Sequence, residues 1–366
     1  MSRIIIAGFK GRSGSATHFA EMAAALKRIV PYGQLVVEYD MVEMGPRRAI
    51  ETKESDVLIL FKPVPYVRAG YIIKWAIFET ACPPKKMITW LADSSEIWVP
   101  SEWGRSVLIA HGITPSKIMV VREGVNPSIY NRLGKVVREP VPIKLLCVAT
   151  LHVRKGLSDV VDAFLAAKLD PSEVELVLQV GQSGRYDFPG YYSSDDLLPK
   201  ISNSDNIKLR QQGIDSSSMG VFYRSHHAFI CGSRGEGWGL PVIEAAAAGL
   251  PIISPLHTGL AEFLSDVKPH IYSVGFGKES FDHTCLYSED WIDEDSSVND
   301  YWHPVNKLDL SEKIVSCVND IKSGRVERAG AIVSDRLRKN FSWDMAASVA
   351  WSHILERPLA GLQLSL

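Results

Sequence analysis

The chain has 366 residues, 46% of them hydrophobic and 22% charged, which is long enough for two globular domains and too apolar for a disordered protein. Its 40 Lys and Arg nearly balance its 42 Asp and Glu, for a formal net charge of -2. This balance excludes a protein that coats a polyanion, so no nucleic-acid partner is expected. Its five cysteines lie far apart with no C-x-x-C pair, which excludes a disulfide framework and a zinc cluster.

The N-terminus is expected to form the first strand of a sheet. Only Met-Ser-Arg precedes the apolar residues 4–9, which together are too short for a signal peptide. No apolar run approaches the roughly 18 to 20 residues that span a bilayer. These features predict a cytoplasmic protein. Basic pairs such as Lys85-Lys86 leave peripheral contact with a membrane open.

The first third of the chain alternates short apolar runs with helical patterns. Strands are predicted at residues 4–9, 34–39, 56–61 and 96–99, and a helix at about 16–29. A turn that contains Gly11 and Gly14 separates the first strand from that helix. Alternation of this kind predicts a parallel sheet with helices on its faces.

The pattern breaks at residues 134–142, where two prolines and several charges indicate a linker. It restarts with strands predicted at 143–149, 174–180, 207–211, 228–231 and 252–254, a helix at 157–168 and an amphipathic segment at 342–356. Two such halves predict an α/β protein with two Rossmann-like domains facing each other across a cleft. Ligands of these sheets bind outside the carboxyl ends of the strands.

The densest chemical signal is a glycine-rich loop and helix at residues 233–251. Pro241 suits a first helical turn and Gly249 suits the end of a helix. The free N–H groups and positive end of such a helix suit a phosphate. Glu236 in the loop and Glu244 about one turn into the helix can accept hydrogen bonds from two sets of hydroxyls, such as those of a sugar and a ribose. Spacing alone leaves open a glycine-rich turn with two solvated glutamates.

This segment resembles the E-x7-E signature of the retaining glycosyltransferases of family 4, which have the two-domain GT-B fold. The matching positions are Ser233, Glu236, Gly237, Gly239, Leu240, Pro241, Glu244, Ala245, Ala247, Gly249 and Pro251. The resemblance implies that Glu236 contacts the donor sugar and Glu244 the nucleotide ribose. It also implies that the donor site includes Gly237, Trp238, Gly239 and Leu240.

A second element, Leu151-His-Val-Arg154-Lys155-Gly156, lies between a predicted strand and a predicted helix. Two adjacent cations beside a glycine and a helix start can hold a diphosphate, although a solvated loop is the plain alternative. The resemblance favours the site, because related enzymes have a Lys-Gly pair here. They commonly carry an arginine shortly before that lysine, where this chain has Thr150, and we expect Arg154 to supply the missing charge.

The N-terminal half matches the family more loosely. Gly14 lies where the family's first glycine loop approaches the donor phosphates. Residues 78–103 resemble a subgroup pattern that places Glu79 on the acceptor side, with a purely structural role left open. The family's histidine near the donor sugar is not placed, because we expect His18 on the surface of its helix.

Two further positions depart from the family or point elsewhere. Thr258 stands where the family often has a glycine, before Gly259 and Glu262. Asp293-Glu-Asp295 formally satisfies the D-x-D pattern of metal-dependent transferases, but it lies late in the chain and outside a strand context. We therefore interpret it as an acidic loop.

The resemblance implies transfer of a sugar from a nucleoside-diphosphate donor to a saccharide or glycolipid acceptor. The transfer would retain the anomeric configuration by front-face attack and need no metal ion or other cofactor. Residues 1–138, joined by the C-terminal helix at 342–366, would form the acceptor-side domain, and 143–341 the donor-binding domain. The alternatives are a nucleotide-sugar-binding protein of this fold without transfer, or a nucleotide-sugar epimerase. The base, the sugar, the acceptor and the oligomeric state stay open.

Overall fold

The computed structural model describes residues 3–9, 11, 14–40, 49–63, 69–133, 142–181, 194–281, 286, 291 and 300–356. The chain divides into two compact units. The first unit comprises Met1–Phe78, Lys85–Asn126 and Phe341–Leu366, and the second comprises Glu79–Pro84 and Pro127–Asn340. Most of the predicted linker and the whole of Asp293-Glu-Asp295 lie outside the described residues.

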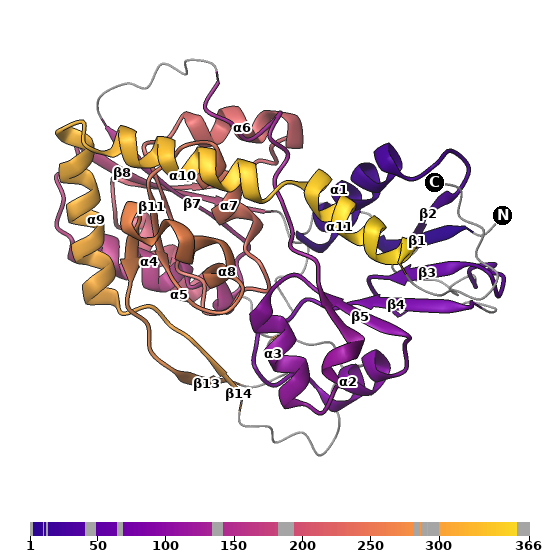
Figure 1. Ribbon diagram of the computed structural model, residues 1–366. Helices are drawn as coiled ribbons and strands as arrows, with labels where there is room; N and C mark the ends of the chain where they lie inside the picture. Colours follow the sequence, from indigo (N-terminus) through magenta and orange to yellow (C-terminus); the bar gives the residue numbers. More distant parts are fainter. Residues whose placement is uncertain are drawn as a thin grey trace. The chain divides into compact units, whose positions relative to one another are not determined.

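The first unit contains, in its described residues, a parallel sheet of order β2-β1-β3-β4-β5-β6 (Figure 1). Its strands are β1 (Ile4–Phe9), β2 (Leu35–Asp40), β3 (Val57–Leu60), β4 (Tyr71–Trp75), β5 (Glu96–Val99) and β6 (Ile118–Val120). Its helices are α1 (Gly14–Ile29), α2 (Lys85–Ala92), α3 (Glu102–Ala110), the 3-10 turn η1 (Pro115–Lys117) and α11 (Trp343–Leu355). All four residues of β3 and of β5 are buried, as expected for parallel strands covered on both faces.

The last helix, α11, packs against α1 within the first unit. Ser342 caps it, since its side chain accepts a hydrogen bond from the N–H of Met345. The chain approaches this cap closely at Gly124, where an added Cβ would lie 2.2 Å from the carbonyl carbon of Ser342. The end of the chain therefore completes the unit formed by its beginning.

The second unit contains a parallel sheet of order β12-β11-β10-β7-β8-β9 and an antiparallel pair, β13 with β14. The strands are β7 (Ile143–Ala149), β8 (Val174–Val180), β9 (Ile207–Arg210), β10 (Ala228–Ile230), β11 (Ile252–Pro255), β12 (Tyr272–Val274), β13 (Glu279–Phe281) and β14 (Asp300–Trp302). The helices are η2 (Val153–Lys155), α4 (Leu157–Ala166), α5 (Ser194–Ser202), α6 (Ser216–Arg224), α7 (Leu240–Ala247), α8 (Leu260–Leu264), η3 (Ser265–His270), α9 (Lys307–Lys322) and α10 (Val326–Asn340).

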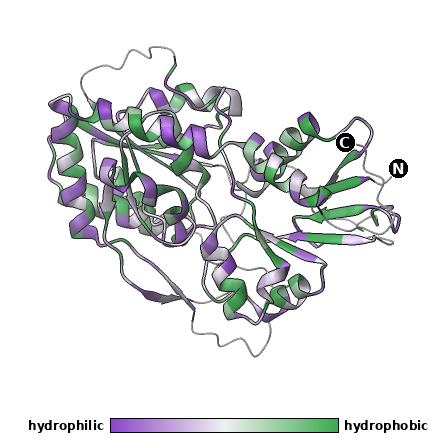
Figure 2. Cartoon of the chain, in the orientation of Figure 1, coloured by the Kyte–Doolittle hydropathy of each residue, from purple (hydrophilic) through white to green (hydrophobic). Residues whose placement is uncertain are grey.

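Helices cover the second sheet on both faces. Helices α4 and α9 pack together, and α7 packs against α6 and α10. Strands β7 and β8 are mostly hydrophobic, whereas α9 and α10 alternate apolar and polar residues (Figure 2). The predicted α/β class with two parallel sheets is thus confirmed. That the two domains face each other across a cleft stays a prediction.

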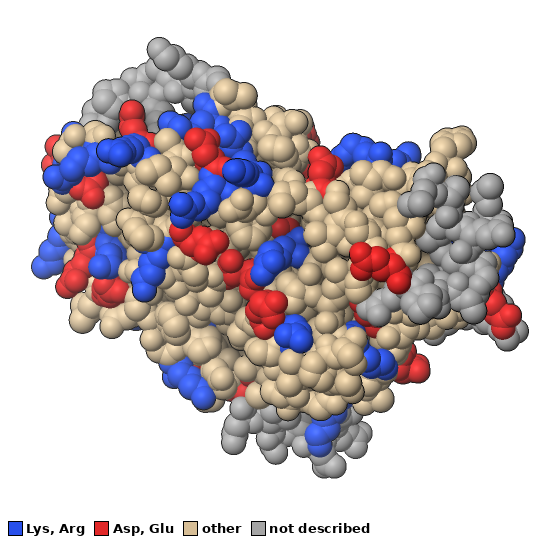
Figure 3. Space-filling model, viewed as in Figure 1, with Lys and Arg blue, Asp and Glu red and all other residues tan. Residues whose placement is uncertain are grey.

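The charged surface fits the near-zero net charge of the chain. On the face shown in Figure 3, acidic and basic side chains are interspersed, with basic ones gathered over α10. Within the described residues, the helices are all too short or too polar to cross a bilayer.

Candidate functional site

The segment from Ser233 to Pro251 forms the loop after β10 and the helix α7. Gly239 precedes the helix with a positive φ of 101°, and Pro241 lies in its first turn. Gly249 follows the helix, also with positive φ (89°). These conformations favour glycine, since a Cβ would be strained there. The local structure predicted for this segment is confirmed.

Glu236 lies in this loop and is 8% exposed. Its carboxylate is 2.5 Å from Lys155 Nζ and 3.2 Å from Arg154 Nη1. Burial opposes ionisation, but the two cations outweigh burial and lower the pKa of Glu236 to about 2. Glu236 is therefore a fixed anion at neutral pH.

Arg154 and Lys155 come from η2, just after β7, and hold the glutamate loop. Arg154 Nη1 donates to the carbonyl of Gly235 at 2.6 Å, and the Arg154 carbonyl accepts from the Arg234 N–H at 2.7 Å. The two loops touch at their glycines, because a Cβ on Gly156 would lie 2.0 Å from the carbonyl oxygen of Gly232. Both predicted cations thus lie beside the first glutamate of the signature.

Glu79 reaches the same cluster. Its Oε1 lies 2.5 Å from Arg154 Nη2, on the opposite end of the guanidinium from the Gly235 contact. Glu79 belongs to the short segment Glu79–Pro84, which groups with the second unit. Its acceptor-side role stays a prediction, and the observed contact is with Arg154.

Glu244 lies in α7 and is also 8% exposed. Its Oε2 accepts a hydrogen bond of 2.9 Å from the hydroxyl of Tyr223, which lies on α6. Burial and the nearby Glu244 raise the pKa of Tyr223, so the phenol keeps its proton and donates it. The alternative of two solvated glutamates is wrong. Tyr223 was missed, because no spacing in the sequence relates α6 to α7.

The backbone of Glu236 is held by the loop after β11. Its N–H donates to Thr258 Oγ1 at 3.1 Å, and its carbonyl accepts from the Gly259 N–H at 2.8 Å. Thr258 has a φ of 48°, in the left-handed region that glycine prefers. This conformation accounts for the glycine that the family often has here. The threonine adds a hydroxyl that also lies 3.2 Å from His257 Nδ1.

The other predicted donor-site residues are dispersed. Gly14 begins α1 in the first unit. Trp238 is 2% exposed and packs against Phe263 with ring centroids 5.2 Å apart, so its ring forms part of the core. Gly237 and Gly239 lie in the glutamate loop, and Leu240 begins α7. Their roles in donor binding stay predictions.

His18 is not a surface residue, and that prediction is wrong. The ring is fully buried in the first unit among Phe61, Trp75 and Trp343. Its Nδ1 lies 2.9 Å from Glu123 Oε1. The reason is that α1 is covered by α11, so the face that carries His18 is turned into the unit's core.

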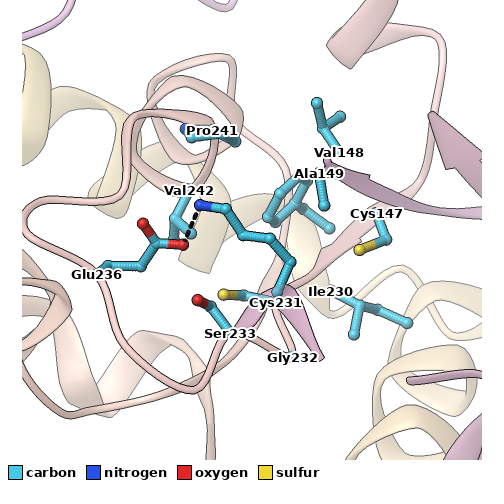
Figure 4. Close-up of a pocket in the computed structure, with 12 residues that line it drawn as sticks. Cys147, Val148, Ala149, Ile230, Cys231, Gly232, Ser233, Glu236, Pro241 and Val242 are labelled. Carbon is cyan, nitrogen blue, oxygen red and sulfur yellow. Dashed lines mark hydrogen bonds and ion pairs between the residues drawn. The ribbon is translucent and has the colours of Figure 1, made fainter. Parts of the chain in front are cut away.

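A small pocket opens beside Glu236 and Lys155 (Figure 4). Its volume of about 20 Å³ has room for little more than one water molecule. Cys147 and Cys231 also line it. Burial raises the pKa of the Cys231 thiol to about 11 and that of Cys147 further, so neither is a thiolate nucleophile at neutral pH. The polar chemistry of the pocket lies in the Lys155–Glu236 pair.

Comparison with known proteins gives one family match. A model of the family described as "Family 4 Glycosyltransferase in conflict systems" matches residues 135–349. Among curated proteins, the chain is 30% identical over 111 residues to the serotype-specific mannosyltransferase WbdA of Escherichia coli, covering 30% of this chain and 13% of that protein. It is 26% identical over 241 residues to the amylovoran biosynthesis glycosyltransferase AmsK of Erwinia amylovora, covering 61% and 54%. The chain thus spans from about an eighth to about half of these relatives.

Solved structures resemble the chain over nearly its whole length. A glycosyltransferase from Rickettsia africae superposes with a TM-score of 0.70 at 14% identity, covering 97% of this chain and 99% of that one. WaaG, a glycosyltransferase involved in lipopolysaccharide biosynthesis, gives a TM-score of 0.65 at 12% identity, covering 97% and 100%. These likenesses confirm the expected GT-B fold.

Proposed function

Since the chain belongs to the family 4 glycosyltransferases of conflict systems, we propose that it transfers a sugar from a nucleoside-diphosphate donor to a saccharide or glycolipid acceptor, with retention at the anomeric carbon. The observation that carries the proposal is the cluster of Arg154, Lys155 and Glu236 at the E-x7-E loop. The relatives named for mannosyl transfer and amylovoran biosynthesis support a saccharide acceptor.

The two cations can stabilise the negative charge of a departing diphosphate. Departure of the diphosphate breaks the bond between the anomeric carbon and a phosphate oxygen, and leaves an oxocarbenium-like sugar. Negative charge then grows on the phosphate, and Arg154 and Lys155 would stabilise it more in the transition state than in the ground state. Their positions are preset, because both already contact the buried Glu236.

Glu236 is proposed to orient the donor sugar. With its pKa at about 2 it stays ionised, so it accepts hydrogen bonds from sugar hydroxyls and is no source of protons. A retaining route without a carboxylate nucleophile then requires attack from the face that the diphosphate leaves. The departing phosphate takes the proton of the acceptor hydroxyl as the new glycosidic bond forms. No step of this route calls for a metal ion.

Glu244 is proposed to bind the nucleotide ribose. A carboxylate accepts several hydrogen bonds, and Tyr223 donates to its Oε2. A carboxylate is suited to accept hydrogen bonds from the hydroxyls of the ribose. Tyr223 would act as a positioning residue, since it fixes the orientation of the carboxylate from the neighbouring helix α6.

The proposal can be tested by thermal shift with UDP-glucose, GDP-mannose and ADP-glucose. We expect one of them to stabilise the wild type, and Glu244→Ala to abolish that shift. The matched control is Glu312→Ala, which removes an exposed glutamate from α9 and should keep the shift. Slow release of the nucleoside diphosphate would further support transfer chemistry. Binding without any release would favour a binding protein, and binding of no member would contradict the proposed function.

A further inference from the structure

One carboxylate of the cluster lies outside the E-x7-E segment. Glu79 pairs with Arg154 Nη2 at 2.5 Å, although Phe78 and Lys85 on either side of its segment group with the first unit. Glu79–Pro84 is thus a short stretch of chain that leaves one unit to join the other. Its place in the second unit needs a physical reason.

The contacts of neighbouring residues explain why Glu79 belongs to the second unit. Thr80 donates a hydrogen bond from its hydroxyl to Asp300 on β14, and both residues are 1% exposed. Thr80 Oγ1 also accepts from the Cys82 N–H at 3.0 Å. On the other side, Gly235 lies against the Glu79 backbone, since an added Cβ would be 2.2 Å from the Glu79 carbonyl oxygen. Buried contacts therefore hold the backbone of Glu79 beside the Arg154 cluster.

Among the described residues, the two cations of the cluster pair with two carboxylates. Arg154 and Lys155 face Glu236 and Glu79, two cations against two carboxylates. The side chain of Glu236 is 10% exposed and contacts both cations, whereas that of Glu79 is 31% exposed. Because its side chain is more exposed, the Glu79 carboxylate can move away from Arg154 at a smaller energetic cost than that of Glu236. An incoming diphosphate carries charges of the same sign, so it is repelled while Glu79 stays on the guanidinium.

We propose that the Glu79 carboxylate competes with the diphosphate of a nucleoside-diphosphate ligand for Arg154 Nη2, and that the diphosphate replaces it there. Glu79 then sets the affinity of the site, because it competes with the phosphates and favours departure of the product. This inference rests on the proposed function, since it takes Arg154 as a diphosphate contact. It makes Glu79 an affinity-determining residue for the donor and its nucleotide product.

The test is calorimetric titration of UDP, GDP, ADP and inorganic pyrophosphate into the full chain. Glu79→Gln keeps the size of the side chain and removes its charge. We expect it to bind the diphosphate that the wild type prefers about two- to fivefold more tightly, as removal of one partly exposed like charge predicts. Glu173→Gln is the matched control, because it removes a carboxylate that pairs with Lys322 on the surface of the same unit. Its affinity should equal that of the wild type.

A second variant ties the effect to Arg154. In an Arg154→Gln background, binding should be weaker and Glu79→Gln should add no gain. Equal or weaker binding by Glu79→Gln in the otherwise wild-type chain would overturn the inference while the proposed function stands. An equal gain with and without Arg154 would overturn it as well. Failure of every diphosphate to bind both the wild type and Glu79→Gln would overturn the proposed function together with the inference.

Discussion

The two glutamates of the E-x7-E segment are equally buried, but their surroundings differ in kind. Glu236 in the loop contacts two cations, and its pKa falls to about 2. Glu244 in α7 accepts a hydrogen bond from the neutral Tyr223. Glu236 in the loop is therefore held by charge interactions, and Glu244 in the helix by a directed hydrogen bond. Changes at the loop should have large, pH-dependent effects, and changes at the helix smaller ones that ionic strength barely alters.

The largest effect is expected from Arg154→Met. It leaves Glu236 with one cation fewer, leaves Glu79 without this partner, and removes the donor to the Gly235 carbonyl. Breaking a buried ion pair on one side typically costs about 3 to 5 kcal/mol in the free energy of unfolding. Chemical denaturation measures this loss. Adding Glu236→Gln should restore part of the stability, and a single mutant as stable as the wild type would contradict the described cluster.

The second largest effect is expected from acid, which should lower the free energy of unfolding through the loop that carries Glu236. The pKa of Glu236 is about 2 in the folded chain against an ordinary value of 4.5, so its contribution is fully present above pH 4.5 and is lost as the pH falls toward 2. That contribution is about 3 kcal/mol. The buried His226 and His257, each with a pKa lowered to about 4, also reduce stability below pH 6.5. In Glu236→Gln the loss between pH 4.5 and 2 should shrink by the share of Glu236, whereas the share of His226 should persist.

Tyr223→Phe tests the hydrogen bond between Tyr223 on α6 and Glu244 on α7. The change removes the hydroxyl that donates to Glu244 and leaves that buried carboxylate less well satisfied, at a cost of about 1 to 3 kcal/mol. Under the proposed function, nucleotide affinity should also fall while the rate of sugar release at saturation changes little. Thermal denaturation and initial rates report the two effects. A loss confined to the saturated rate would speak against Tyr223 as a positioning residue for Glu244.

The smallest effect separates two contributions of Thr258. Thr258→Ala keeps the strained left-handed backbone but loses the hydroxyl that accepts from the Glu236 N–H, for a loss of about 1 kcal/mol. Thr258→Gly loses the same hydrogen bond but relieves strain of similar size, so its stability should stay near that of the wild type. Denaturant titration of both variants decides the point. An alanine variant more stable than the glycine one would show that the backbone strain is absent.

Much of the fold could be predicted from the sequence where periodicity was strong. The apolar runs at residues 4–9, 143–149 and 174–180 correspond to β1, β7 and β8. Strands β4, β6 and β12 and the pair β13 with β14 were missed, since they are short and lack a clear alternation. The burial of His18 could have been predicted from the sequence, because His18, Met22 and Leu26 recur every four residues on the buried face of α1.

The site was predictable only within its two motifs. Glu236, Arg154 and Lys155 could be found because loop glycines and spacing relate them to local structure. Thr258 and Glu79, which contact this group, and Tyr223, which contacts Glu244, lie elsewhere in the chain, and these contacts depend on tertiary folding. The Glu79 contact in particular depends on Thr80 meeting Asp300, 220 residues later. No local pattern encodes such a pairing.

The most direct test of the central claim is the release of nucleoside diphosphate from whichever of UDP-glucose, GDP-mannose and ADP-glucose stabilises the wild type. If Lys155 stabilises the departing phosphate, Lys155→Met should lower the saturated rate roughly 100-fold or more, while Lys155→Arg, which keeps the charge, retains a larger share. Circular dichroism would confirm that both variants are folded. Release by folded Lys155→Met at the wild-type rate would contradict the assignment of this cluster to the leaving group.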